Sequence, residues 1–380
     1  MRQTCLLCQR QHPDGNLHCE QSWCPGEASP WLLEPGEHLA ELEITRVLTV
    51  TRSAALYAAM RQNEPVLLKV AHQGSAHKDR LKHEAELLAV AQVKQVAAPF
   101  LPVLLPAKPS APEGAKTGAK ATEKTEVYGK TVLDGKLLYY YVCRYSEGES
   151  LRDLMRKQPQ LWVQHAGLIA VQLCTAITYL HRRNLYHYGL SPESVLVRFS
   201  AETPPLPRIL LVDLGLAAAT DQVSAAWYPD FVMPAYTAPE LLDERRSLPK
   251  AANQPVPPDP RVDVYALGLI LAELLTGRPV FNGSLRSDAA TAGLVIRNQR
   301  TPMDRGDDLR AVAQLALQAS DPQLSKRIAD PATLGKQLLP YFGDVPPEKA
   351  KEAMNRRNLW IGAAAAITLA LLAAIALSMT

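Results

Sequence analysis

The sequence predicts an α+β protein with two lobes, a strand-rich lobe of about 100 residues followed by a helical lobe of about 200 residues. Residues 43–70 alternate between apolar and polar side chains, which is the pattern of half-buried strands. Residues 162–182 carry apolar side chains at the spacing of a helix that packs on one side. Of the 380 residues, 47% are hydrophobic and 21% are charged, and this composition excludes wholesale disorder.

The first 24 residues form a cysteine-rich segment that is too short to hold a hydrophobic core. Its cysteines follow a C-x2-C, x10, C-x4-C pattern at Cys5, Cys8, Cys19 and Cys24. Paired thiolates suit tetrahedral zinc, whose binding supplies folding free energy, so we expect a structural zinc ribbon at residues 1–30. Two alternatives stay open, namely His12 or His18 in place of one thiolate, and a redox pair of Cys5 with Cys8.

The strand-rich lobe is expected at residues 43–147, after a linker at 31–42. Apolar spacing at 79–93 predicts a helix between the strands. Residues 107–126 have alanine as their only apolar residue type and predict a flexible insertion. Asp134-Gly135 stands between two apolar runs, which is a strong signal of a tight hairpin.

Eight short motifs occur in an order and spacing that is more specific than any one of them. They are PVLLK (65–69), HEAELL (83–88), YSEGESL (145–151), YLHRRNLYHYGLSPESVLV (179–197), LLVDLGLA (210–217), AYTAPE (235–240), DVYALGLILAELLTGRPVF (263–281) and DPQLSKR (321–327). Together they resemble the protein kinase family from Glu43 to Phe342. The resemblance implies a two-lobed kinase-like fold, a buried ion pair of Glu240 with Arg327, and a role for Asp263 in bracing the catalytic-loop backbone.

The resemblance also implies a nucleotide site. Lys69 matches the lysine of the third strand, and Glu84 matches the helix glutamate that pairs with it. Asp213 matches the metal-binding aspartate, so these three residues are the candidates to bind ATP and magnesium. A purely structural role is the alternative, because a lysine–glutamate pair also ties a sheet to its helix. Leu67 stands where the family has a small alanine under the adenine, which predicts weaker nucleotide binding.

Several parts of the family's chemistry are missing from the sequence. The stretch 49–56, which matches the glycine-rich loop, contains no glycine. Gly189 occupies the position of the carboxylate that accepts the substrate's proton, so no catalytic residue remains there. Ser191 and Ser194 replace a lysine and a metal-binding asparagine, and Val232-Met233 replaces a pair that helps to seat a peptide. We therefore expect a pseudokinase.

The last 22 residues are uncharged and predict a membrane anchor. Residues 358–380 are nearly all apolar, and a helix of this length spans a hydrocarbon core of about 30 Å. No basic residue follows the segment. Four basic residues precede it, namely Lys349, Lys351, Arg356 and Arg357. The positive-inside rule then leaves the N-terminal body in the cytoplasm, and we expect a bacterial inner membrane.

The expected organisation has five parts. They are a zinc-ribbon-like segment (1–30), a linker (31–42), a kinase-like domain (43–343, with lobes 43–147 and 148–343), a juxtamembrane segment (344–357) and a transmembrane helix (358–380). The net charge of +3, with only Arg2 and Arg10 as fixed cations among the first 30 residues, argues against a nucleic-acid partner.

The expected function is a scaffold or regulator that binds protein partners at the cytoplasmic face of a membrane, with residues 358–380 in contact with lipid. The alternative is an atypical serine/threonine kinase or nucleotidyl transferase that binds ATP through Lys69, Glu84 and Asp213. Such an enzyme would need a displaced carboxylate, for which Asp221 and Asp230 are candidates.

Overall fold

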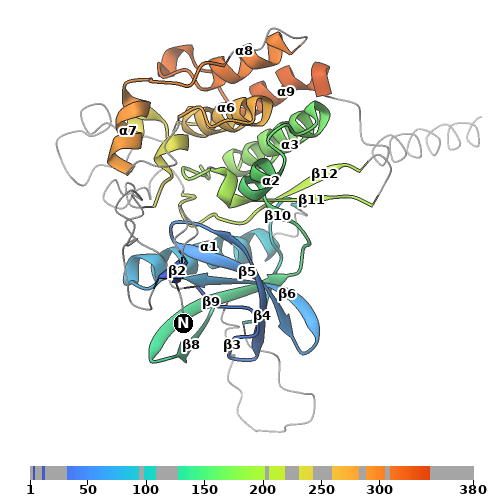
Figure 1. Ribbon diagram of the computed structural model, residues 1–380, viewed down its shortest axis with the longest axis vertical. Coiled ribbons are helices and arrows are strands. Elements are labelled where there is room, and N and C mark those ends of the chain that lie inside the picture. Colours follow the sequence, from blue (N-terminus) through green and yellow to red (C-terminus); the bar gives the residue numbers. More distant parts are fainter. Residues whose placement is uncertain are drawn as a thin grey trace, which may run out of the picture. The chain divides into compact units, whose positions relative to one another are not determined.

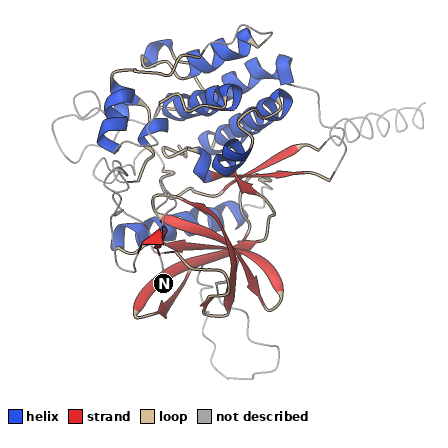
Figure 2. Cartoon of the chain, viewed as in Figure 1, coloured by secondary structure: helices blue, strands red, loops and turns tan. Residues whose placement is uncertain are grey.

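The fold is that of a computed structural model of the whole chain. The residues described are 3–4, 11–12, 32–93, 98–107, 127–201, 205–218, 231–242, 259–281, 288–303 and 309–342. The chain divides into two compact units, residues 1–338 and 339–380, and both lobes lie in the first unit. A sheet dominates the N-terminal lobe and helices dominate the C-terminal lobe, as predicted (Figure 2).

The N-terminal lobe is built on an antiparallel sheet in which β3, β4, β5, β6, β9 and β7 lie in that order, with β8 also paired to β9 (Figure 1). The strands are β3 (His38–Leu39), β4 (Leu42–Val50), β5 (Ala54–Arg61), β6 (Glu64–Ala71), β7 (Leu104–Leu105), β8 (Gly129–Leu133) and β9 (Lys136–Arg144). Helix α1 (Ser75–Val93) packs against β6, β7 and β9. A separate ladder pairs β1 (Gln3–Thr4) with β2 (Gln11–His12).

The hairpin predicted at Asp134-Gly135 is confirmed. Leu133 pairs with Lys136 across a two-residue turn, and both turn residues have positive φ, 49° for Asp134 and 74° for Gly135. Such a turn matches the twist of the strands and favours glycine at its second position. The helix predicted at 79–93 is also present, and it begins four residues earlier, at Ser75.

Residues 32–42 pack onto the sheet, although we expected them to form a linker. Leu33 and Leu39 are 2% and 0% exposed in the apolar cluster on one face of the sheet. The backbone N–H of Leu33 donates to the hydroxyl of buried Tyr57 at 3.1 Å. The buried apolar surface of the two leucines stabilises this segment on the lobe.

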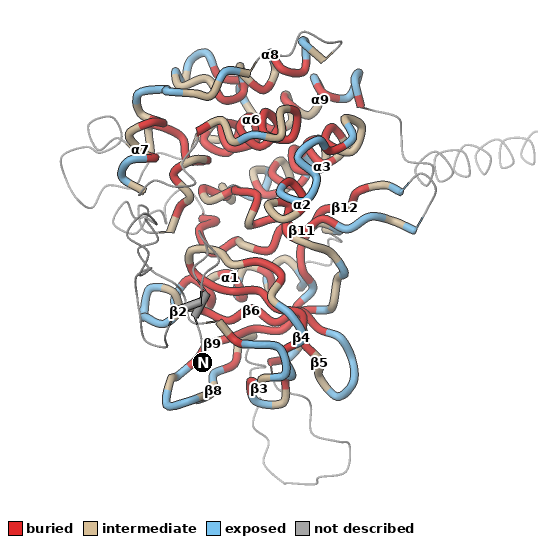
Figure 3. The backbone as a smooth tube through the Cα atoms, viewed as in Figure 1, coloured by how far each residue is buried: buried red, intermediate tan, exposed pale blue. Residues whose placement is uncertain are grey.

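The C-terminal lobe is centred on α6 (Arg261–Thr276), in which every residue from Val262 to Leu275 is buried (Figure 3). The other helices are α2 (Leu151–Lys157), α3 (Val163–His181), α4 (Pro239–Leu242), α7 (Asp288–Ile296), α8 (Arg310–Ala319) and α9 (Pro331–Phe342). Strands β10 (Glu149–Ser150), β11 (Val195–Phe199) and β12 (Pro207–Leu211) form a small sheet. Gly277 ends α6 at φ 67°, and a Cβ there would lie 2.1 Å from the carbonyl oxygen of Pro159.

The helix predicted at 162–182 is α3, at Val163–His181. Among the described residues it is the one helix long and apolar enough to cross a membrane, but half of its apolar window is buried in the protein. Its contacts with α6 make it a core helix of the lobe. Cys174 on α3 and Cys143 on β9 are buried thiols, as expected, and burial raises the pKa of Cys174 to about 12.

Candidate functional site

Lys69, Glu84 and Asp213 come together between the lobes, as their motifs predict. The Lys69 ammonium donates to Glu84 Oε2 at 2.5 Å, to the Val212 carbonyl at 2.8 Å and to Asp213 Oδ1 at 2.9 Å. The second oxygen of Glu84 accepts the Leu214 N–H at 2.8 Å, which ties α1 to the turn after Asp213, where kinases have their metal-binding turn. An ammonium has three donors, so all the donors of Lys69 are used inside the protein.

The charges of this cluster stabilise one another. Burial lowers the pKa of Lys69, but the carboxylates of Asp213 and Glu84 outweigh burial and leave that pKa above its ordinary value. For Asp213, burial raises the pKa, but the Lys69 ammonium outweighs it and leaves the pKa below its ordinary value. Lys69 and Asp213 are therefore both charged at neutral pH and form a closed ion pair.

The turn between β4 and β5 stands where a kinase has its glycine-rich loop, and it is held close to the cluster. The Thr49 hydroxyl donates to the Glu193 carbonyl at 2.8 Å, which links β4 to residues 187–194, the segment that matches the catalytic loop of kinases. His72 bonds to the Thr51 carbonyl at 2.9 Å, and the His72 N–H donates to the Ser53 carbonyl at 3.0 Å. Thr51 also helps to lower the pKa of Asp213, so its side chain lies beside the carboxylate.

Two large apolar side chains lie beside Lys69 on its face of the sheet. Lys69 pairs with Leu56 in the sheet, and Leu67 lies two residues away on the same face. Leu56 and Leu67 are 3% and 1% exposed. The bulk predicted for Leu67 at the adenine position is therefore packed into the lobe.

Gly189, at the position of the catalytic base, faces a space that Leu216 already fills. A Cβ on Gly189 would lie 2.7 Å from the Leu216 Cδ1, closer than such atoms approach in proteins. Leu216 is 7% exposed and comes three residues after Asp213. The loss of the carboxylate is thus accompanied by an apolar side chain in its place.

The two serines of the catalytic loop bond to each other. The Ser194 hydroxyl donates to the Ser191 carbonyl at 2.7 Å and accepts the Ser191 N–H at 3.1 Å. Ser194 is 0% exposed, so its oxygen serves the turn rather than a metal ion. Kinase domains typically use ATP and magnesium. Lys69, Glu84 and Asp213 are placed together as such a site requires, whereas Ser194 does not fit the second magnesium-ligand position.

The backbone of the catalytic loop is held by Asp263, as the resemblance to kinases implies. Asp263 accepts the N–H groups of His187 at 2.8 Å and Tyr188 at 2.9 Å, and also bonds to His181 at 2.8 Å. Burial raises the pKa of Asp263, but these hydrogen bonds and the nearby His181 outweigh burial and lower it.

The ion pair predicted between Glu240 and Arg327 is also present. It is bidentate, at 2.7 and 3.0 Å. Fork-shaped guanidinium contacts of this kind are among the stronger hydrogen-bonded pairs in proteins. The pair joins α4 to the turn before α9.

One network in the C-terminal lobe was not anticipated from the sequence. Arg152 on α2 pairs with Glu193 at 2.8 Å and with Glu273 of α6 at 2.7 Å, and it also donates to the Tyr236 hydroxyl. The motif ESLRDL contains Arg152, but its partners are 41 to 121 residues away, so no local pattern connects them.

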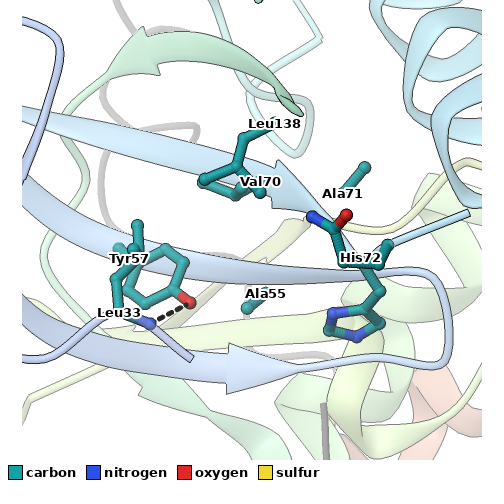
Figure 4. Close-up of a pocket in the computed structure, with 8 residues that line it drawn as sticks. Leu33, Ala55, Tyr57, Val70, Ala71, His72 and Leu138 are labelled. Carbon is teal, nitrogen blue, oxygen red and sulfur yellow. Dashed lines mark hydrogen bonds between the residues drawn. The ribbon is translucent and has the colours of Figure 1, made fainter. Parts of the chain in front are cut away.

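A small hollow lies in the N-terminal lobe, mainly on the face of the sheet opposite Lys69 (Figure 4). It is lined by Leu33, Ala55, Tyr57, Val70, His72 and Leu138 among others, and Figure 4 shows the hydrogen bond between Leu33 and Tyr57. Ala55, Tyr57 and Val70 alternate along their strands with residues of the Lys69 face. The hollow is therefore separate from the cleft.

Several of the predicted features lie outside the described part of the chain. They are the cysteines Cys5, Cys8, Cys19 and Cys24, the alternative carboxylates Asp221 and Asp230, nearly all of the insertion at 107–126, the juxtamembrane segment 344–357 and the anchor 358–380. Among the described residues, no group of three or more His, Cys, Asp or Glu side chains is placed to hold a metal ion.

Comparisons with known proteins agree with this geometry. The family described as "Protein kinase domain" matches residues 127–322. The serine/threonine-protein kinase PknB of Mycobacterium leprae is 29% identical over 221 residues, which are 56% of this chain and 32% of that protein. A probable serine/threonine-protein kinase of Corynebacterium efficiens is 28% identical over 174 residues, 46% of this chain and 24% of that protein.

A serine/threonine-protein kinase of Streptomyces coelicolor is 32% identical over 153 residues, 40% of this chain and 25% of that protein. The matched part of this chain thus spans a third or less of the length of these curated relatives. The family match covers about half of the chain and takes in the catalytic loop, Asp213 and Asp263. By its fold, its motifs and this match, the chain belongs to the protein kinase domain family.

Proposed function

We propose that this chain is a pseudokinase that transfers little or no phosphate and holds or regulates protein partners at the cytoplasmic face of a membrane. The observation that carries the proposal is the pair of Gly189 and Leu216. The position of the base has no side chain, and the volume that an aspartate would need is occupied. A new carboxylate cannot enter without moving Leu216.

Rate arguments support the same proposal. Loss of a general base reduces rates by about 10²- to 10⁴-fold, and kinases turn over about 1 to 100 times per second. The saturated ammonium of Lys69 and the packed Leu67 add to this loss, because they oppose binding of the phosphates and the adenine. The expected turnover is thus far below that of a working kinase.

The membrane and zinc parts of the proposal rest on the sequence. Residues 358–380 are proposed to anchor the chain, and the four N-terminal cysteines are proposed to hold a structural zinc ion. Tethering raises the local concentration of partners on the same membrane, so weak binding to each partner is sufficient. Deletion of 358–380 should move the protein to the soluble fraction, and its persistence on membranes would contradict the anchor.

One observation favours a second candidate function. Lys69, Glu84 and Asp213 are assembled in one cluster, as in an atypical kinase or nucleotidyl transferase that binds ATP. This enzyme would have to free Lys69 from two carboxylates and a carbonyl before it could contact phosphate. The same assembly is explained by a structural role, since it ties α1, β6 and the metal-binding turn together.

Transfer of labelled γ-phosphate separates the two functions. The full chain in detergent is incubated with ATP, magnesium or manganese, and a general protein substrate, beside Asp213→Asn. The pseudokinase proposal predicts equal and negligible labelling by both proteins. Labelling at ordinary kinase rates that is lost in Asp213→Asn would overturn it in favour of the enzyme.

A further inference from the structure

The last turn of α9 carries three consecutive exposed apolar residues, which we call the α9 tip. Leu339 and Tyr341 are 47% and 44% exposed, and Pro340 between them is exposed as well. Successive helical residues are rotated by about 100°, so these three positions cover the whole side of the turn that faces away from the protein. The water-facing side of a helix is normally polar, and the tip departs from that pattern.

The rest of the helix holds the tip in place. Leu334, Leu338 and Phe342 form a buried stripe at four-residue spacing, with exposed fractions of 1%, 0% and 2%. At the start of α9, Asp330 accepts the Thr333 N–H at 2.7 Å and the Thr333 hydroxyl at 3.0 Å. These contacts fix both ends of the helix, so the apolar side chains of the tip are presented by an ordered turn.

The charge of α9 suits an anionic surface. Lys336 is its one charged residue, is exposed, and lies about one turn before the tip. That separation is shorter than the Debye length of about 8 Å at physiological ionic strength, so the tip and the ammonium can act on the same surface. Tyrosine is enriched among lipid headgroups, and lysine beside a bilayer attracts anionic lipids. The composition of this surface therefore fits the interface of a membrane.

The position of the tip in the chain favours the membrane as its partner. Among the described elements, α9 is the last before the proposed anchor at 358–380, and residues 343–357 separate the two. At full extension this connection reaches about 50 Å, so the anchor keeps the tip within that distance of the lipid. Tethering at such a range raises the effective concentration of the lipid surface, and a small apolar contact is then sufficient.

We propose that the α9 tip contacts the lipid headgroup region beside the anchor, with the end of α9 directed toward the bilayer. The proposal rests on the membrane anchor of the proposed function and adds which part of the kinase-like domain touches lipid. An anchor alone leaves the domain free to rotate at the end of its connection. A second contact at the tip restrains that rotation and presents a constant face of the domain to partners on the same membrane.

Photo-cross-linking in lipid nanodiscs tests this contact. The full chain is reconstituted in discs of phosphatidylcholine and phosphatidylglycerol, with one residue replaced by photoreactive benzoylphenylalanine. Tyr341→benzoylphenylalanine keeps an aromatic ring at an exposed position, so the fold should be retained. After irradiation it should form lipid adducts, which mass spectrometry of the protein detects.

The matched control is Leu137→benzoylphenylalanine, on the β8–β9 hairpin, because Leu137 is 47% exposed, close to the 44% of Tyr341. The yield of lipid adducts at position 341 should exceed that at 137 by about fivefold or more. Equal yields at the two positions would overturn the proposal. So would adducts of position 341 to protein in place of lipid, since the tip would then be a protein-binding surface.

A third variant separates this proposal from the anchor on which it rests. Leu371→benzoylphenylalanine lies inside the proposed anchor and should form lipid adducts in the same discs. Adducts at 371 without adducts at 341 would overturn the contact of the tip and leave the anchor standing. Absence of lipid adducts at both positions would overturn the anchor and, with it, the contact.

Discussion

The catalytic-base position and the contacts that hold the loop around it differ sharply in this chain. Asp263 has two hydrogen bonds to the loop and a third to His181 of α3, and Glu240 forms its bidentate pair with Arg327. On the other side of the same loop, Gly189 has no side chain and Leu216 fills the space. The comparison teaches that the contacts that fold the lobe are separable from the groups that perform chemistry.

Packing explains why the two regions differ. A buried carboxylate with several donors is expensive to remove, because its partners are left unpaired in the interior. A catalytic carboxylate at the surface of a cleft has fewer such partners, so an apolar neighbour can replace it. Substitutions in the scaffold should therefore destabilise the protein strongly, and substitutions in the cleft should do so less.

The largest effect is expected for Asp263→Ala. The substitution leaves the N–H groups of His187 and Tyr188 without their acceptor and should lower the free energy of unfolding by about 3 to 5 kcal/mol. Urea unfolding followed by circular dichroism measures it. Asp263→Asn, which keeps one acceptor, should lose less. A loss below about 1 kcal/mol for the alanine variant would remove the basis of the comparison.

The second effect is a dependence of the free energy of unfolding on pH, caused by His72. Burial lowers the pKa of His72 to about 4, whereas the unfolded side chain titrates near 6.5. Between these values the unfolded chain binds a proton that the folded chain does not bind, so stability falls as the pH decreases. The expected contribution is roughly 2 to 3 kcal/mol across this window.

Denaturant unfolding of the wild type and His72→Gln from pH 7.5 to 4 isolates this contribution. The glutamine amide can still donate to the Thr51 carbonyl, so the fold should be retained. The variant should lose less stability than the wild type between pH 6.5 and 4. Parallel curves for the two proteins would mean that His72 accepts a proton in the folded state.

A third, smaller effect is expected for Gly189→Asp. Overpacking against Leu216 should lower the free energy of unfolding by about 1 to 3 kcal/mol, and phosphate transfer should not return. The double variant Gly189→Asp/Leu216→Ala makes room and should recover part of the lost stability. A single variant as stable as the wild type would show that Leu216 moves aside freely, and the comparison would lose its packing argument.

The smallest effect is expected at an exposed ion pair. Lys157 and Glu149 are joined at 2.5 Å, with side chains 67% and 30% exposed. Lys157→Ala should change the free energy of unfolding by less than about 1 kcal/mol, because such pairs are screened by water and salt. A larger loss of unfolding free energy would show that an exposed ion pair at short distance stabilises the protein as much as a buried one. It would contradict the distinction between exposed pairs and the buried contacts of Asp263.

The sequence was sufficient for features that depend on local patterns or on motifs. Alternation and turn residues predicted the sheet and the hairpin, and the motifs predicted the contacts of Lys69, Asp263 and Glu240. Leu216 was not anticipated, because the volume it fills is created by residues distant in sequence. The zinc ligands and the membrane anchor stay predictions.

The packing of residues 32–42 was missed for a different reason. Pro35 and Gly36 interrupt this stretch, and only the apolar face of the sheet shows that Leu33 and Leu39 have a place to be buried. The network of Arg152 was missed because an arginine on a predicted helix has no sequence signature for distant carboxylates. Tertiary contacts of this kind require the folded arrangement.

The central claim is that the site around Lys69 and Asp213 does not bind ATP with magnesium. The most direct test is the melting temperature of the full chain with millimolar ATP, with and without magnesium. A ligand present at about 100 times its dissociation constant stabilises a protein by about 2.7 kcal/mol, which moves the melting temperature by several degrees. We predict no magnesium-dependent shift, in the wild type or in Asp213→Asn. A shift present in the wild type and abolished in Asp213→Asn would contradict the account, because it would mean that Lys69 and Asp213 open to bind the nucleotide.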